Sequence, residues 1–80
     1  MNDFERDQLR RLILKLIADG YNHWTIIEKR ACGSGFGFAT SNTVKRQFYD
    51  YLVAWGYVAR VRRGKYVLTK KGQLLLVLLS

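Results

Sequence analysis

The stretch from Ser41 to Lys71 reads SNTVKRQFYDYLVAWGYVARVRRGKYVLTKK and predicts a helix, a tight β-hairpin and the start of a second helix. Ser41, or Thr40 in its place, can cap the first helix because a side-chain hydroxyl accepts from the free backbone N–H groups of the first turn. Gly56 is expected to end this helix, since glycine tolerates a left-handed φ. The remainder of the chain supplies the surface against which this unit packs.

Apolar side chains recur at helical spacing between residues 41 and 55. They define an inner face made of Val44, Phe48, Tyr51, Leu52 and Trp55. At about 100° per residue, the opposite face carries a polar set with Lys45 on its flank. That set consists of Asn42, Arg46, Tyr49 and Val53. We therefore expect one face of this helix to be buried and the other to be available for binding.

Residues 57–62 and 65–68 have the composition of β-strands, and Arg63-Gly64 between them suits a tight turn with glycine at positive φ. The tip of this predicted hairpin is strongly basic. It carries Arg60, Arg62, Arg63 and Lys65. Thr69 can then cap a last helix over residues 70–79.

The order TVKRQFYDYLVAWGYV followed by RRGKYVLTKKG resembles the winged helix-turn-helix family of DNA-binding proteins, most clearly in the second half of the chain. The resemblance implies one α+β domain over residues 1–80. It would have a three-helix core, a two- to three-stranded β wing and a C-terminal helix. It also implies a recognition helix in the major groove and a wing over the phosphates or the minor groove. Small regulators of this shape are common in bacteria, archaea and their viruses and plasmids.

The resemblance implies sequence-specific binding of double-stranded DNA and a transcriptional regulator, most simply a repressor, in the cytoplasm or nucleoid. Arg46 and Asn42 are the predicted base readers, because Arg pairs with guanine and Asn with adenine. The full recognition-helix set is Ser41, Asn42, Thr43, Lys45, Arg46 and Tyr49, and the wing set is Arg60, Arg62, Arg63 and Lys65. Two alternatives are a winged-helix protein–protein module and a non-specific or single-strand binder, with Tyr49, Phe36 and Phe38 as stacking platforms.

The charge of the chain is concentrated in its second half. The net charge is +8, and residues 41–80 hold eight basic side chains against Asp50 alone, a balance of +7. Residues 1–40 hold six basic and five acidic side chains, a balance of +1. A polyanionic partner is the simplest explanation of such clustering, and a solvated surface is the alternative.

The first half of the chain predicts two helices. Asn2 or Asp3 can cap a helix that runs to about Ala18, with a core stripe of Leu9, Leu12, Ile13, Leu16 and Ile17. Thr25 and Glu28 have capping-box spacing at the start of a second helix, with Asn22 as the alternative cap, which runs to about Cys32. In the winged-helix pattern, a brief strand in the connector at residues 21–24 pairs with the wing.

The segment from Cys32 to Ala39, CGSGFGFA, is longer than the usual three- or four-residue turn between two such helices. Its alternating glycines suggest a phosphate-binding loop, but the strand and the Lys-Ser/Thr of a P-loop are missing. We interpret the segment as a flexible turn in which Phe36 and Phe38 anchor to the core. Its backbone N–H groups could also meet a DNA phosphate at the start of the next helix.

The predicted last helix ends in LLLVLL and is apolar on every side, which indicates burial on every side. Because an 80-residue chain can cover only part of it, we expect a homodimer. The expected interface residues are Leu14, which points away from the core stripe of the first helix, and Leu75, Leu78 and Leu79.

Catalytic and metal-binding chemistry have little support in the sequence. His23 is the single histidine and Cys32 the single cysteine, so four metal ligands are lacking, no intramolecular disulfide can form and no catalytic triad is evident. The N-terminus is acidic and polar, unlike a secretory signal, and the run Leu74–Leu79 is too short to span a bilayer. We expect a non-enzyme with no cofactor, metal, membrane or small-molecule substrate.

Overall fold

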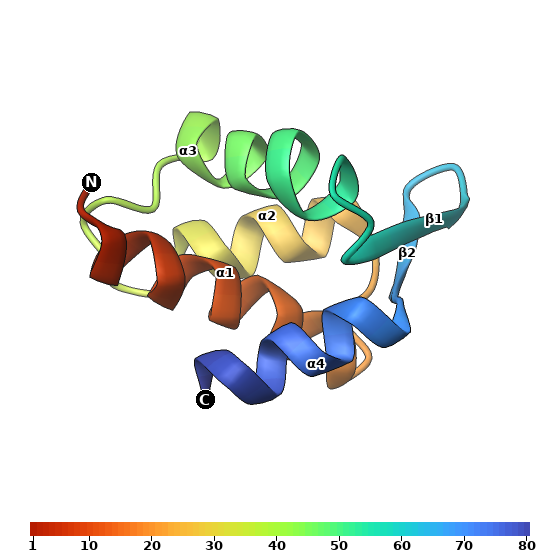
Figure 1. The fold of residues 1–80 in the computed structure, drawn as a ribbon. Helices are drawn as coiled ribbons and strands as arrows, with labels where there is room; N and C mark the ends of the chain where they lie inside the picture. The colour runs from red at the N-terminus through yellow and green to blue at the C-terminus, as the bar shows by residue number, and fades with distance from the viewer.

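Helix α1 (Asp3–Ala18) runs through the middle of the domain, and most other elements pack against it. In this computed structural model, which describes residues 1–80, its neighbours are α2 (Trp24–Cys32), η1 (Arg46–Val53), β2 (Lys65–Leu68) and α4 (Lys70–Leu79). Helix α3 (Ser41–Lys45) continues directly into η1, and β1 (Val58–Arg62) pairs with β2 in an antiparallel hairpin. Helices α3 and α4 lie on opposite sides of α1, and the hairpin projects from one end (Figure 1). The architecture is an α+β domain of four helices and one hairpin.

The first helix has the predicted bounds and the predicted cap. The side chain of Asn2 accepts from the Glu5 backbone N–H at 2.8 Å, and the Glu5 carboxylate accepts from the Asn2 N–H at 3.0 Å. This reciprocal pair satisfies two backbone donors that a helix start leaves free. A local sequence signal therefore fixes where α1 begins.

The predicted cap of the second helix is wrong. Helix α2 begins at Trp24, one residue before Thr25, and its cap residue His23 makes no side-chain capping bond. The Trp24 N–H instead donates to the Gly64 carbonyl at 2.9 Å, and the Tyr66 N–H donates to the Asn22 carbonyl at 2.9 Å. The hairpin thus supplies the acceptor that a capping side chain would provide. The predicted connector strand is reduced to one bridge between His23 and Lys65.

The third helix is capped by Thr40, whose hydroxyl accepts from the Thr43 N–H at 3.2 Å. From Arg46 onward it winds as a π-helix, and the Ala54 N–H bonds to the carbonyl five residues back, at Tyr49. A π-helix turns through a smaller angle per residue, so positions late in the helix rotate away from α-helical expectation. Trp55, predicted to be buried, is 62% exposed, and Val53, predicted to face outward, packs on the core.

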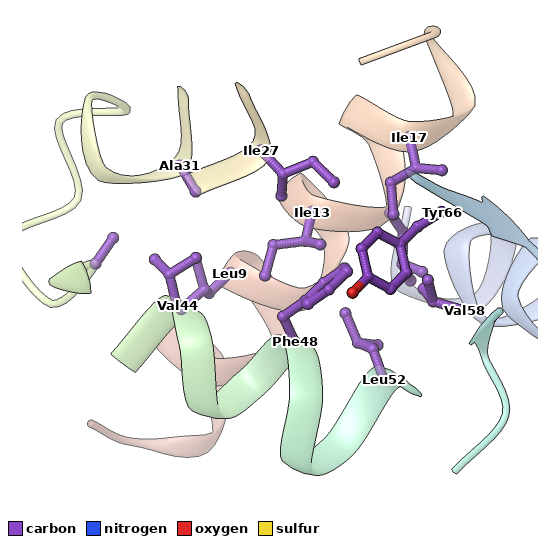
Figure 2. Close-up of a cluster of buried hydrophobic side chains, with 12 residues drawn as sticks. Leu9, Ile13, Ile17, Ile27, Ala31, Val44, Phe48, Leu52, Val58 and Tyr66 are labelled. Carbon is purple, nitrogen blue, oxygen red and sulfur yellow. The ribbon is translucent and has the colours of Figure 1, made fainter. Parts of the chain in front are cut away.

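The core lies between α1, α2, the α3–η1 helix and the hairpin (Figure 2). Its fully buried side chains include Leu9, Ile13, Ile27, Val44, Phe48, Leu52 and Val58. Leu14 is also fully buried, so the prediction that it points away from the core toward a dimer interface is wrong. The physical reason is that α1 is packed on several sides at once, and a single amphipathic stripe does not describe a central helix.

Hydrogen bonds of the Thr69 side chain connect the start of the hairpin to the first turn of the last helix. The Thr69 hydroxyl lies 2.6 Å from the Gly56 carbonyl and 3.1 Å from the Tyr57 carbonyl, and it accepts from the Gly72 N–H. Gly72 is buried, and a Cβ there would lie 1.9 Å from the Tyr57 carbonyl oxygen. The Thr-x-x-Gly pattern therefore caps α4, as predicted, and also brings its first turn against the start of β1.

None of the helices combines the length and the apolar character that crossing a membrane requires. The His, Cys, Asp and Glu side chains form no group of three or more that could hold a metal ion.

Candidate nucleic-acid interface

The outer face of the α3–η1 helix carries a polar and basic groove. Asn42, Lys45 and Arg46 are exposed and line this groove together with Tyr49 and Asp50. Four of the residues predicted to contact DNA, including Tyr49, therefore line one accessible groove. Asp50 lies at the same groove and brings the one negative charge of the set.

The two hydroxyl residues at the start of α3 are engaged within the protein. Ser41 donates to the Glu28 carboxylate at 2.8 Å, and Thr43 shares a hydrogen bond of 2.9 Å with Thr40. A carboxylate at a helix N-terminus stabilises the helix dipole and disfavours a second anion at the same place. The interpretation that the start of this helix meets a phosphate is thus disfavoured. Sequence reasoning gave Glu28 a capping role and had no signal for this contact, because the partner lies thirteen residues away.

Tyr49 forms the floor of the groove. Its ring packs against Trp24 and Phe48, with centroids 5.0 and 4.9 Å away, and its hydroxyl accepts from the Tyr66 hydroxyl at 3.3 Å. Burial raises the pKa of Tyr49 to about 12. Tyr49 is therefore a neutral, half-buried support in the aromatic cluster, although it was predicted to lie on the outward face.

The hairpin carries the second basic group. Arg60, Arg62 and Arg63 are exposed, and Lys65 is half-buried beside the turn, where Gly64 has φ +76° as the tight turn requires. The strands pair Arg60 with Tyr66 and Arg62 with Lys65, and an irregularity lies between the two pairs. This irregularity breaks the strict alternation of faces along β1. The predicted hairpin and its basic tip are confirmed.

The two basic groups lie next to each other on the molecule. Arg60 is near enough to Tyr49 for its positive charge to oppose the rise in the phenol's pKa that burial causes. Strand β1 packs against η1, so the hairpin leaves the fold at the end of that helix (Figure 1). All ion pairs of the structure belong to Arg6 and Lys15 on α1. The basic side chains of α3–η1 and of the hairpin have no acidic partner within the fold.

The glycine-rich segment between α2 and α3 is anchored as predicted. Phe36 and Phe38 stack with ring centroids 5.1 Å apart, and both pack against the core. The Ser34 hydroxyl donates to the Ala31 carbonyl at 2.7 Å, and Gly35 takes φ +89°. Because the two rings are half-buried against each other and the core, they offer little free face for a stacking base.

Comparison of the chain with protein-family models, with curated proteins and with solved structures finds no match. Its function is argued below from its own residues.

Proposed function

We propose that the chain is a winged helix-turn-helix protein that binds double-stranded DNA. In this proposal, α2 and α3–η1 form the helix-turn-helix, α3–η1 is the recognition helix, and the β1–β2 hairpin is the wing. The observation that carries it is a set of exposed cations without acidic partners on the two elements that would meet the duplex. These are Lys45, Arg46, Arg60, Arg62 and Arg63.

Each basic group has a separate task in this proposal. Arg46 and Asn42 reach base edges from the exposed groove and form bidentate pairs with guanine and adenine. Lys45 contacts a backbone phosphate beside them. The wing cations neutralise phosphates, or place one Arg in a narrow minor groove. Tyr49 holds the groove floor, and Ser41 and Thr43 maintain the start of the helix.

Such a surface suits regulation by occupancy of a promoter, most simply repression, and the protein would act in the cytoplasm where its DNA target lies. The proposal requires no cofactor. The eight residues between α2 and α3 make the connection longer than in most members of the family, and the stacked Phe36–Phe38 pair fixes its path.

A protein-binding module is the second candidate, and the exposure of Trp55 favours it. This side chain is 62% exposed just after η1, and Trp is one of the residue types enriched at the centres of protein interfaces. The charge distribution nevertheless favours DNA, because the wing next to Trp55 is basic.

The test is a binding series with a randomised duplex pool at increasing salt. We expect affinity to fall steeply with salt, because each neutralised phosphate releases counterions, and one sequence to be enriched by selection. Steep salt dependence without enrichment would indicate a non-specific binder. If single-stranded DNA competes for the protein as well as duplex DNA does, the protein would be a binder of single-stranded nucleic acid. No binding at low salt would refute DNA binding and favour the protein-binding candidate.

A further inference from the structure

Helix α4 exposes a row of large apolar side chains. Leu74, Val77 and Leu78, here named the α4 ridge, are 65%, 71% and 80% exposed. Their spacing of three and four residues places them on one side of the helix. The opposite side, with Leu75, Leu76 and Leu79, packs on the core. Two residues expected at a dimer interface, Leu75 and Leu79, are therefore largely used inside the domain.

The apolar surface extends beyond α4 on both flanks. Toward the start of α1, Phe4 is 69% exposed and lines a shallow groove with Leu78 and Leu79. Toward β2, Val77 lines a second, mainly apolar groove with Val67 and Ile17. A continuous apolar surface of this kind is unusual on a monomeric protein and marks a contact site.

The charges at the two ends of the α4 ridge have opposite signs. Lys70 is exposed at the first turn of α4. The last turn of α4 lies beside the start of α1, where Asp7 borders the groove with Leu78 and Asp3 is 88% exposed. Asp3 lies 3.1 Å from Arg6, whereas Asp7 lies 3.9 Å from it. Asp7 is therefore only weakly paired within the domain and can interact with a cation of another molecule. Arg11 lines the same groove.

We propose that the α4 ridge binds a second copy of this chain through an antiparallel pair of α4 helices about a two-fold axis. A two-fold contact is self-complementary, so opposite charges at opposite ends of one ridge meet each other in the dimer. Leu74 and Val77 lie near the axis, and Phe4 and Leu78 of each copy lie against the N-terminal half of α4 of the other copy. Lys70 of each copy faces Asp7 of the other.

The charge pattern selects a second copy over other occupants. An anionic lipid surface gives no role to Asp3 and Asp7 at one end of the ridge, whereas Lys70 of a second copy would pair with Asp7. DNA finds no polar or basic recognition surface on the ridge itself. Because α4 lies on the far side of α1 from α3, the dimer leaves the basic surface open (Figure 1). This inference goes beyond DNA binding and does not depend on it.

The size of the ridge predicts a reversible dimer. A ten-residue helix is about 15 Å long, and a stable interface buries roughly 800 Å² on each partner. The helix pair alone is short for this area, so Phe4 and the groove at Val67 must contribute. We expect dissociation at accessible protein concentrations and a melting temperature that rises with concentration.

Sedimentation equilibrium without DNA tests the interface. We expect the wild type to be dimeric at high concentration and Val77→Glu to be monomeric, because the carboxylate would be buried without a partner. Val61→Glu is the matched control, since Val61 is 58% exposed on the hairpin, away from α4, and this variant should dimerise as the wild type does. Circular dichroism verifies that each variant is folded. A wild type that stays monomeric, or an unchanged dimer of Val77→Glu, would overturn the proposal.

A charge exchange tests the orientation. Lys70→Glu should weaken the dimer severalfold by placing two acids together, and adding Asp7→Lys should recover the wild-type dissociation constant. No recovery would refute the antiparallel arrangement, and binding of the wild type to anionic vesicles would replace the second copy with a lipid surface. A monomer that binds DNA would overturn only this inference, whereas a dimer that binds no DNA would overturn only the proposed function.

Discussion

Some cations of this domain lie against aromatic rings, and others have no partner within the fold. On the α1, α2 and α4 side, Arg10 lies 3.3 Å above the centroid of the Tyr51 ring, Arg30 lies 3.9 Å above Tyr21, and Lys71 lies 4.5 Å above Tyr57. On the α3–η1 and hairpin side, the exposed cations have no aromatic ring and no carboxylate as partner. A cation held against a ring contributes to the fold, whereas a free cation is available to a ligand.

Arg10 is an example of a cation whose interaction partners all lie within the domain. Its Nε donates to the Gln47 side chain at 2.8 Å while its guanidinium covers Tyr51, which stacks on Tyr57 at 5.5 Å. Burial lowers the pKa of Arg10, and the neighbouring Tyr51 opposes this shift. Arg46, in contrast, is exposed in its groove. Two arginines with the same charge can therefore have different roles, one in stability and the other in binding. The predictions below test the difference between side chains that stabilise the fold, here named the framework, and the exposed cations of α3–η1 and the hairpin, here named the free surface.

The largest effect is expected in the framework, at Gly72. Alanine normally stabilises a helix interior relative to glycine, but here its Cβ would overlap the Tyr57 carbonyl, 1.9 Å away. We therefore expect Gly72→Ala to reduce the free energy of unfolding by at least about 3 kcal/mol. Thermal melting measures the change. Gly37→Ala is the control, because no atom lies within 4 Å of its Cβ position, and it should leave stability nearly unchanged.

The next effect is expected at Arg46. Arg46→Ala should cost about 1–3 kcal/mol of binding to the selected duplex and relax the sequence preference, without changing the melting temperature. Arg10→Ala is the matched control, and it should lower the melting temperature while the folded protein keeps its DNA affinity. Equal losses by Arg46→Ala on all duplexes would reassign Arg46 to a phosphate contact. Loss of affinity by folded Arg10→Ala would remove the distinction between the two groups of cations.

The sequence predicted those parts of the fold that depend on contacts between residues close together in the chain. The starts of α1 and α4 were predictable because Asn2 with Glu5 and Thr69 with Gly72 satisfy backbone donors within one helical turn. The hairpin was predictable because Gly64 allows the turn between two strand-forming runs.

The features that were not predictable have causes distant in the chain. The start of α2 follows from a hydrogen bond to the Gly64 carbonyl, forty residues away from Trp24 in sequence. Leu14 is buried because α1 is enclosed by several elements, and the outward turn of Trp55 follows from π-helical winding. At the candidate interface, charge and exposure were predictable from composition, but the use of Tyr49 and Ser41 by the protein itself was not.

A smaller effect is expected at the hairpin tip. Replacing Arg62 and Arg63 by Ala should weaken binding to every duplex alike and reduce the slope of log affinity against log salt by about two, one unit for each lost phosphate contact. Both side chains are exposed and without ion pairs, so stability should not change. Affinity measured at several salt concentrations gives the slope. An unchanged slope would show that the hairpin does not contact the duplex.

The smallest effect is expected at Tyr49, on the border between the two regions. Tyr49→Phe removes one 3.3 Å hydrogen bond with Tyr66 and keeps the ring packing, so stability should fall by about 1 kcal/mol or less and DNA affinity should not change. A loss of affinity with a reduced salt slope would instead make the Tyr49 hydroxyl a phosphate contact and extend the free surface to the groove floor.

The stability of the protein at alkaline pH distinguishes a Tyr49 hydroxyl bonded within the fold from a solvated one, without any DNA being present. The pKa of Tyr49 is raised from 10.0 in its ordinary state to about 12 in the fold, so the folded protein holds the phenol proton more tightly than the unfolded chain. This contribution is complete below pH 10 and is lost as the pH rises toward 12. The difference in stability between wild type and Tyr49→Phe should therefore change across that interval and be constant below it. A difference that stays constant through the interval would mean that the hydroxyl is solvated, and Tyr49 would then belong with Arg46 to the free surface.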